Sequence, residues 1–177
     1  VHSVRVWFTG HGAGLHRRET FVYSLLVPDR ARTVFPCFDQ PDLKASLSLT
    51  LDVPEAWTAV SNTTATTDVP DGGRRRIAFA PTRPLPTYLF AFVAGRLVCT
   101  AGAGRVRRLV HVVSDAGAVA REAAELCRLH DQALAWMERY TGVPHPFDAL
   151  DVVLLPDFPF SGMEHPGALA YNAVSQL

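Results

Sequence analysis

Apolar and polar residues alternate over much of the first hundred positions. The clearest run covers residues 46–53, where leucine or valine takes every second position before Pro54. A period of two turns successive side chains to opposite faces of a sheet, so this run predicts a half-buried strand. Further β-rich runs predict strands at residues 1–8, 20–27, 57–61, 75–80 and 87–94. Many short strands separated by glycine and proline predict an antiparallel β-sandwich.

The pattern changes after Gly104. Residues 106–113 predict one more strand, and Ser114-Asp115 is a candidate helix N-cap. Apolar residues then recur at steps of three and four up to Tyr140, which predicts an amphipathic helix. Gly142 followed by Pro144 is a typical stop signal. Strands at 150–155 and 168–171 complete a predicted β-α-β segment.

These two patterns divide the chain into a β domain at 1–103 and a second segment at 104–177. The second segment is too short to close a hydrophobic core of its own. Hydrophobic residues make up 48% of the 177 positions, a composition typical of globular proteins. The expected fold is therefore mostly β: an antiparallel sandwich followed by the beginning of another domain.

The charge balance excludes some partners. Lys plus Arg and Asp plus Glu each number 17, which gives no electrostatic argument for a nucleic acid or an anionic membrane. No apolar run approaches the roughly 20 residues that a membrane-spanning helix needs. The three cysteines are widely spaced, which argues against a disulfide framework and fits a reducing compartment, so we expect a cytoplasmic protein.

A Pro-, Phe- and Gly-rich loop at 158–167 holds a single carboxylate, Glu164. A carboxylate held in a stiff loop can pair with a cationic ligand such as a free amine. By composition alone, an ordinary exposed glutamate is the more frequent case. None of the seven histidines begins an H-E-x-x-H motif or has a second histidine four residues away, so we expect no metal site and no catalytic residue within the chain.

Two segments resemble the aminopeptidase N family of zinc peptidases, to which leukotriene hydrolase also belongs. Residues 161–165 read Ser-Gly-Met-Glu-His and are similar to the family's Gly-Ala-Met-Glu-Asn exopeptidase motif. Residues 31–45, which include Phe-Pro-Cys-Phe-Asp-Gln-Pro, resemble a second family signature, and Thr58–Asn62 continue it. The flanks at 140–147, 150–158 and 166–171 match as well, so the likeness covers nearly the whole chain.

The resemblance implies a saddle-like N-terminal β-sandwich followed by the first β-α-β part of a thermolysin-like catalytic domain. It also implies that Glu164 binds the free α-amino group of a peptide substrate. Met163, Gly162 and Ser161 would line the first side-chain pocket and offer backbone hydrogen bonds. The family's zinc ligands lie further along the chain, so zinc and the remainder of the catalytic domain would come from outside these residues.

Three departures from the family pattern bear on this site. Ser161 replaces the first glycine of the motif, and His165 replaces its asparagine, which helps to position substrate in the family. A histidine adds a group that can titrate near neutral pH. The third departure is the absence of the glutamine that many relatives have before the second signature, where this chain reads Leu25-Leu26-Val27-Pro28-Asp29. We interpret residues 35–44 mainly as a structural corner.

Two other functions are compatible with the sequence. The chain could be a non-catalytic β-sandwich interaction module in which the β-α-β segment is a remnant. The coding sequence after Leu177 would decide between the two. By resemblance to the family, an H-E-x-x-H about thirty residues beyond Glu164 would favour the enzyme, whereas a stop codon would favour the module. A thiol enzyme that uses Cys37, Cys99 or Cys127 is disfavoured because no histidine and acid pattern accompanies them.

Overall fold

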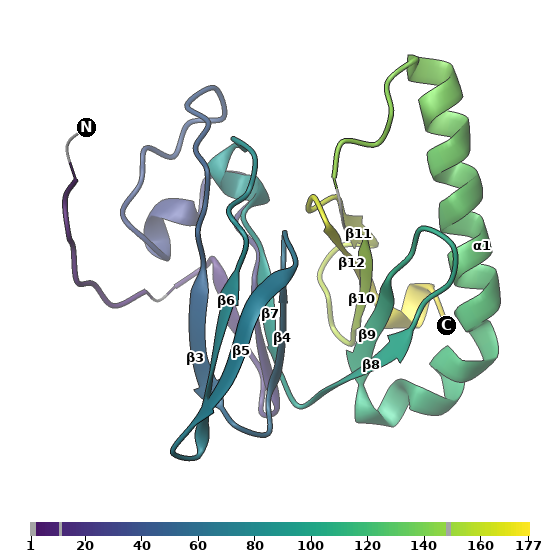
Figure 1. The fold of residues 1–177 in the computed structure, drawn as a ribbon, viewed down its shortest axis with the longest axis horizontal. Helices are drawn as coiled ribbons and strands as arrows, with labels where there is room; N and C mark the ends of the chain where they lie inside the picture. Colours follow the sequence, from purple (N-terminus) through teal and green to yellow (C-terminus); the bar gives the residue numbers. More distant parts are fainter. Residues whose placement is uncertain (1–2, 11, 148–149) are drawn as a thin grey trace.

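The computed structural model describes residues 3–10, 12–147 and 150–177. Three β-sheets and one long α-helix lie in successive layers (Figure 1). The fold is mostly β, and the helix follows most of the strands, which confirms the predicted fold class.

The first two sheets form the sandwich. The three-stranded sheet has the order β3-β6-β5, and the four-stranded sheet has the order β1-β2-β7-β4. Every pairing in these two sheets is antiparallel. Their strands are β1 (Leu15–Arg17), β2 (Phe21–Ser24), β3 (Thr50–Pro54), β4 (Thr58–Ser61), β5 (Ala65–Asp71), β6 (Arg74–Phe79) and β7 (Phe92–Gly95).

The third sheet is mixed and has the order β11-β12-β10-β9-β8. Its strands are β8 (Leu97–Ala101), β9 (Arg108–Val112), β10 (Asp151–Leu155), β11 (Gly162–Met163) and β12 (Ala168–Asn172). β10 is parallel to both β9 and β12, and α1 (Ala116–Thr141) connects β9 to β10. The predicted β-α-β segment is therefore present. β8 precedes the predicted boundary at residue 103 yet pairs with β9 in this third sheet.

The four-stranded sheet is covered on both faces. Ala59 and Ala94 pack toward the three-stranded sheet, whereas Val60 and Val93 pack toward the five-stranded sheet. The alternation of a single strand thus serves two cores, since successive side chains point to opposite faces.

The five-stranded sheet is likewise buried between two layers. Val153 and Leu155 of β10 face the four-stranded sheet. Val152 and Leu154 point the other way and pack against Leu126 and Cys127 of α1. Such a strand reads as a continuous hydrophobic run because both of its faces are covered. α1 closes this side of the molecule (Figure 1).

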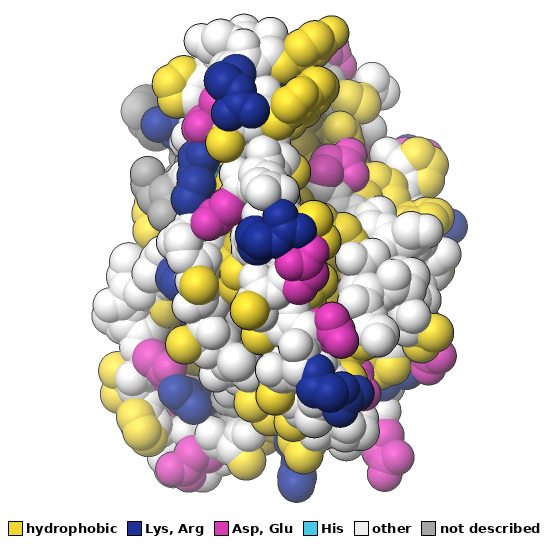
Figure 2. All heavy atoms as spheres, turned by 90° about the vertical axis from the view of Figure 1, so that its right-hand side faces the viewer, with side chains coloured by type: hydrophobic (Ala, Val, Ile, Leu, Met, Phe, Trp, Pro, Cys, Tyr) yellow, Lys and Arg dark blue, Asp and Glu magenta, His cyan; other side chains and the backbone are white. Residues whose placement is uncertain are grey.

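The outer face of α1 carries charged side chains of both signs (Figure 2). Exposed hydrophobic side chains gather near its C-terminal end, and these are Trp136, Met137, Tyr140 and Val143. In the described part of the chain, no helix is long and apolar enough to cross a membrane.

The strand predicted at the N-terminus is wrong. Residues 3–10 form no strand, and Val4 and Trp7 are 86% and 81% exposed. Their alternation finds no neighbouring strand to pair with, and a lone strand has no partner for its backbone groups. Residues 1 and 2 lie outside the described residues.

Two other predicted strands are shorter than expected. The run at 46–53 becomes a strand only at Thr50, because its partner beyond Phe79 contains Pro81, Pro84 and Pro86. Residues 45–49 still bond to that segment, but through separate contacts such as Leu47 N to Thr82 Oγ1 at 2.9 Å. The run at 87–94 begins with a 3₁₀ turn at Thr87–Leu89, and β7 starts at Phe92.

Candidate functional site

The loop between β10 and β12 carries all five residues that the sequence marked for substrate binding. It leaves β10 at Pro156 and returns along β12 as the short strand β11, in which Gly162 pairs with Tyr171 and Met163 with Ala170. β11 is the last strand on its side of the sheet, so its outer edge has no partner strand among the described residues. An unpaired edge presents backbone donors and acceptors to an incoming chain.

The backbone of this loop is tied at several carbonyl oxygens. Asn172 of β12 donates from its side-chain Nδ2 to Phe158 O at 2.7 Å and from its backbone N–H to Ser161 O at 3.3 Å. Ala168 N donates to His165 O at 3.1 Å, which closes a turn at Pro166-Gly167. Gly167 has a φ of 77°, a left-handed conformation that suits glycine.

The four side chains of this segment, which also contains Gly162, divide between solvent and core. Ser161 and Glu164 are exposed, whereas Met163 is 6% exposed and His165 is 2% exposed. Met163 lies in the core between the four-stranded and five-stranded sheets. The carboxylate of Glu164 makes no hydrogen bond or ion pair with any residue that the structure describes.

His165 is a buried polar residue in an apolar setting. Burial lowers the pKa of its imidazole to about 4, because the charged form loses its hydration. Its Nε2 atom has no hydrogen-bond partner within the described ranges. His165 borders a cavity of about 10 Å³, which Tyr23 and Ser24 also line. The family resemblance marked this histidine for substrate binding and as a group that can titrate near neutral pH. In the structure its side chain is buried beside the core between the four-stranded and five-stranded sheets.

Asn62 ties the loop to the sandwich. It follows β4, is 4% exposed and donates from Nδ2 to Pro166 O and to Leu89 O, each at 2.9 Å. Its Oδ1 accepts from Ala91 N at 2.8 Å. Sequence reasoning noted Asn62 only as part of a matching segment. The available signal was a polar residue that directly follows a buried strand.

A cleft of about 190 Å³ adjoins this contact. It lies between the sandwich and the segment before β10, and Asn62, Thr63, Arg83, Phe147 and Pro166 are among its lining residues.

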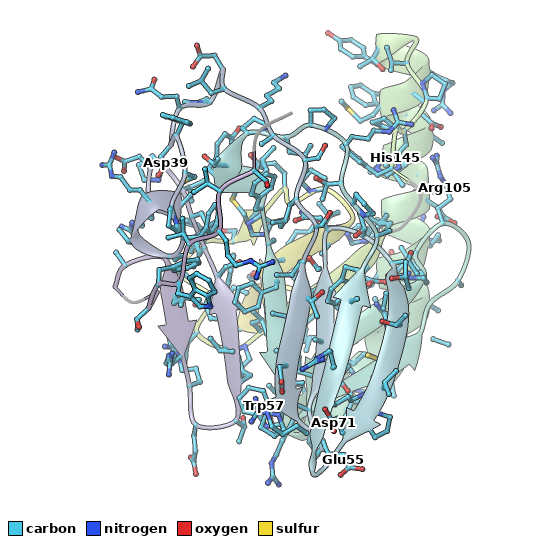
Figure 3. The ribbon with its side chains drawn as sticks, turned by 60° about the vertical axis from the view of Figure 1, so that its left-hand side comes forward. Asp39, Glu55, Trp57, Asp71, Arg105 and His145 are labelled. Carbon is cyan, nitrogen blue, oxygen red and sulfur yellow. The ribbon has the colours of Figure 1, made fainter. Side chains whose placement is uncertain are left out.

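Glu138, near the C-terminal end of α1, binds the chain segments before β9 and after the helix. Arg105 donates from both terminal nitrogens to the carboxylate of Glu138, each at 2.8 Å, and His145 N donates to Glu138 at 2.7 Å. These bonds, led by that from Arg105, lower the pKa of Glu138 to about 2. Arg105 and His145 lie beside α1 in Figure 3, so the chain after the helix is fixed to the turn before β9.

The segment at 35–44 makes structural contacts. Asp39 accepts a hydrogen bond from Arg32 N at 3.1 Å and another from Thr87 Oγ1 at 2.7 Å. Phe35 stacks near Phe90, with ring centroids 6.1 Å apart. Asp39 lies on a loop at the far side of the molecule from α1 (Figure 3). These contacts support the interpretation of this segment as a structural corner.

The described residues contain no cluster of metal-ligating side chains. Within 3–10, 12–147 and 150–177, no three His, Cys, Asp or Glu side chains gather closely enough to hold a metal ion.

His130, on the apolar stripe of α1, bonds to Leu126 O through Nδ1 and to Tyr171 OH through Nε2. Both ring nitrogens thus have partners, so His130 is a structural residue on the apolar face of the helix.

Comparison with known proteins gives a consistent set of relatives. The family model described as the Peptidase M1 N-terminal domain matches residues 16–89. A puromycin-sensitive aminopeptidase from Caenorhabditis elegans is 30% identical over 83% of this chain and 16% of its own length. Aminopeptidase M1-A from Oryza sativa subsp. japonica is 32% identical over 85% of this chain and 17% of its own length.

An aminopeptidase N from Acetobacter pasteurianus is 33% identical over 80% of this chain and 40% of its own length. The chain thus spans 16–17% of the length of the nematode and rice relatives.

Proposed function

Since the chain belongs to the M1 aminopeptidase family, we propose that it is the N-terminal portion of a zinc-dependent aminopeptidase. In this proposal the parent enzyme removes N-terminal residues from peptides, and this chain supplies the loop that anchors the substrate amine. The segment 104–177 would then begin the catalytic domain, and the sandwich at 1–103 would support it. A cytoplasmic location stays a prediction from the cysteine content.

One observation carries the proposal: an exposed carboxylate that pairs with no described residue stands on a loop whose backbone is held at several points. Glu164 is exposed, while its neighbours Met163 and His165 are buried on either side. The backbone around it is bound by β12 and by Asn62. Such a carboxylate can accept charge-assisted hydrogen bonds from an ammonium group without first breaking an ion pair.

The neighbouring residues support the same role. The free edge of Gly162–Met163 could bind the first residues of a peptide as an added strand. A Cβ on Gly162 would lie 2.8 Å from two ring carbons of Tyr171, so the glycine allows the close pairing of β11 with β12. In the proposal Met163 borders the first side-chain pocket from the core side, Ser161 lies at the exposed end of β11, and His165 positions the loop.

Zinc is not assigned to these residues. Among the described residues, no three His, Cys, Asp or Glu side chains gather closely enough to hold the ion. In the proposal the zinc ligands and the general base belong to the remainder of the catalytic domain. What this chain contributes is recognition: an ammonium is distinguished from a neutral amide by the carboxylate that faces it.

The test is kinetic and uses the complete protein that contains this chain. Glu164→Gln preserves shape and removes the charge. We expect kcat/KM on peptides with a free N-terminus to fall by roughly a hundredfold, since a charge-assisted bond to the substrate is weakened. Glu55→Gln is the matched control, because Glu55 is an exposed glutamate at a hairpin end remote from α1 (Figure 3).

Unchanged kinetics in Glu164→Gln would remove this residue from the substrate site. Equal losses in Glu164→Gln and Glu55→Gln would point to a general effect of charge rather than to an anchor for the amine.

A further inference from the structure

Asn62 uses its whole amide group inside the protein. Both Nδ2 hydrogens and the Oδ1 oxygen are engaged: Leu89 O and Pro166 O accept from Nδ2, and Ala91 N donates to Oδ1. Two of these partners belong to the sandwich. The third, Pro166, lies 104 positions away in the loop that carries Glu164.

The contact to Pro166 is placed to control that loop. Pro166 lies two positions after Glu164, and the next carbonyl, that of Gly167, accepts from Asp151 N at 2.9 Å. Two consecutive carbonyl oxygens are therefore bound to two different sheets. Pro166 O binds the sandwich, and Gly167 O binds the five-stranded sheet, so the turn after Glu164 is fixed against both layers.

No simple replacement reproduces this arrangement. Aspartate keeps the acceptor for Ala91 N but, when ionised, sets a negative oxygen against the carbonyls of Leu89 and Pro166. Alanine leaves all three backbone groups without their partner in a buried place. Asparagine is thus matched to the task of joining one amide and two carbonyls.

We propose that Asn62 is a positioning residue for Glu164, through which the N-terminal sandwich takes part in recognising the substrate amine. This proposal rests on the proposed function of Glu164. Asn62 holds Pro166, Pro166 fixes the turn, and the turn sets where the Glu164 carboxylate stands. The sandwich then has a role in specificity besides its role in stability.

The residue directly before Asn62, the last of β4, offers a matched control. Ser61 is also buried, and its Oγ donates to Ala91 O at 2.7 Å, so it makes one buried bond within the sandwich and none to the loop. Ser61→Ala therefore removes a buried polar contact without releasing Pro166.

The first measurement is a double-mutant cycle in the complete enzyme, with kcat/KM on a free-amine peptide as the readout. We expect Asn62→Ala to lower kcat/KM about tenfold or more, since small displacements of a binding group are costly. In the Glu164→Gln background the same change should have little further effect, because the positioned carboxylate is already gone. Ser61→Ala should act equally in both backgrounds. Equal effects of Asn62→Ala in both backgrounds would overturn the proposal.

The second measurement does not require activity. Hydrogen exchange of the amides at 161–168 should be faster in Asn62→Ala than in the wild type, while Ser61→Ala leaves it unchanged. Asn62→Ser, which is milder, serves if the alanine variant does not fold. Unchanged exchange would show that the hydrogen bond from Asn62 to Pro166 does not hold the loop in place. Faster exchange in a protein that does not act on free-amine peptides would instead reject the proposed function and leave the tie standing.

Discussion

At the scale of single residues, the site combines an exposed charge with a buried imidazole directly after it. Glu164 faces solvent, and His165 faces the core between the sheets. The imidazole of His165 has a folded-state pKa of about 4, against an ordinary value of 6.5. A pKa that differs between the folded and unfolded chain makes stability depend on pH.

The sign of this dependence follows from the protons bound. Between pH 6.5 and pH 4 the unfolded chain protonates His165 and the folded chain does not. Unfolding therefore takes up a proton and becomes easier as the pH falls through this window. The difference between the two pKa values corresponds to roughly 3 kcal/mol lost on going from pH 7 to pH 4.

We expect His165→Asn, which restores the residue of the family motif, to flatten this dependence. Urea unfolding at several pH values between 7 and 4 measures it. A smaller slope should remain in the variant, since burial also lowers the pKa of His16. Parallel pH profiles for the wild type and the variant would show that His165 does not titrate in this way.

Sequence reasoning marked the candidate site residues but could not give their orientation. The motif at 161–165 was identified by resemblance, and the direction of each side chain depends on which strand β11 pairs with. Asn62 was not singled out, because its one local signal, a polar residue directly after a buried strand, does not reveal a hydrogen bond to a residue 104 positions away. Local patterns do not encode contacts of this range.

At the scale of elements, α1 was the most predictable part of the fold. Its apolar stripe, its start after Asp115 and its end at Gly142 all agree with the sequence, although Asp115 makes no capping hydrogen bond through its side chain. Strands were less predictable because they depend on a partner. β5 was missed since all of its residues are exposed and show no apolar alternation, whereas residues 3–10 alternate but have no partner.

The two ends of α1 allow a paired test of helix chemistry. Gly142 has a φ of 69°, and a Cβ there would meet no atom within 4 Å, so Gly142→Ala is opposed by backbone conformation alone. We expect a loss of about 1 kcal/mol in the free energy of unfolding.

Gly117 lies in the first turn of α1 with helical neighbours, and a Cβ there would approach only Arg121, at 3.9 Å. Gly117→Ala should therefore gain about 0.5–1 kcal/mol, since alanine restricts the unfolded chain and favours the helix. Urea unfolding of both variants measures the contrast. A change of the same sign at both positions would contradict the assignment of these two backbone conformations.

At the scale of the whole molecule, the layers are joined by apolar packing and by a buried cluster of charges. Asp151 begins β10 and is 0% exposed. Its carboxylate accepts hydrogen bonds from Arg108, the first residue of the neighbouring strand β9, and from Arg107 directly before it. Arg107 also donates to Thr64 Oγ1 of the sandwich at 2.8 Å. The carboxylate of Asp151 thus holds an arginine that bridges two layers, and the backbone N–H of Asp151 donates to Gly167 O in the loop that carries Glu164.

The charge of Asp151 is maintained against its surroundings. Burial alone would raise the pKa of this carboxyl, but the hydrogen bonds from Arg107 and then Arg108 outweigh burial and lower the pKa. Its stabilising contribution is therefore present above its ordinary pKa of 3.8 and is lost only as the pH falls through the lower folded-state value.

Asp151→Asn should cost about 3–5 kcal/mol in the free energy of unfolding, because two half-buried guanidinium groups lose the carboxylate between them. Asp52→Asn is the matched control: Asp52 also faces two arginines, Arg74 and Arg76, but on the exposed surface of β3. Exposed pairs contribute about 0–1 kcal/mol, so this variant should unfold almost as the wild type does. Urea unfolding at pH 7 compares them, and equal losses would mean that burial does not decide the value of the pair. If the difference appears, the buried carboxylate of Asp151 stabilises the protein more than an exposed one does, and it does so through the arginine that also binds Thr64 of the sandwich.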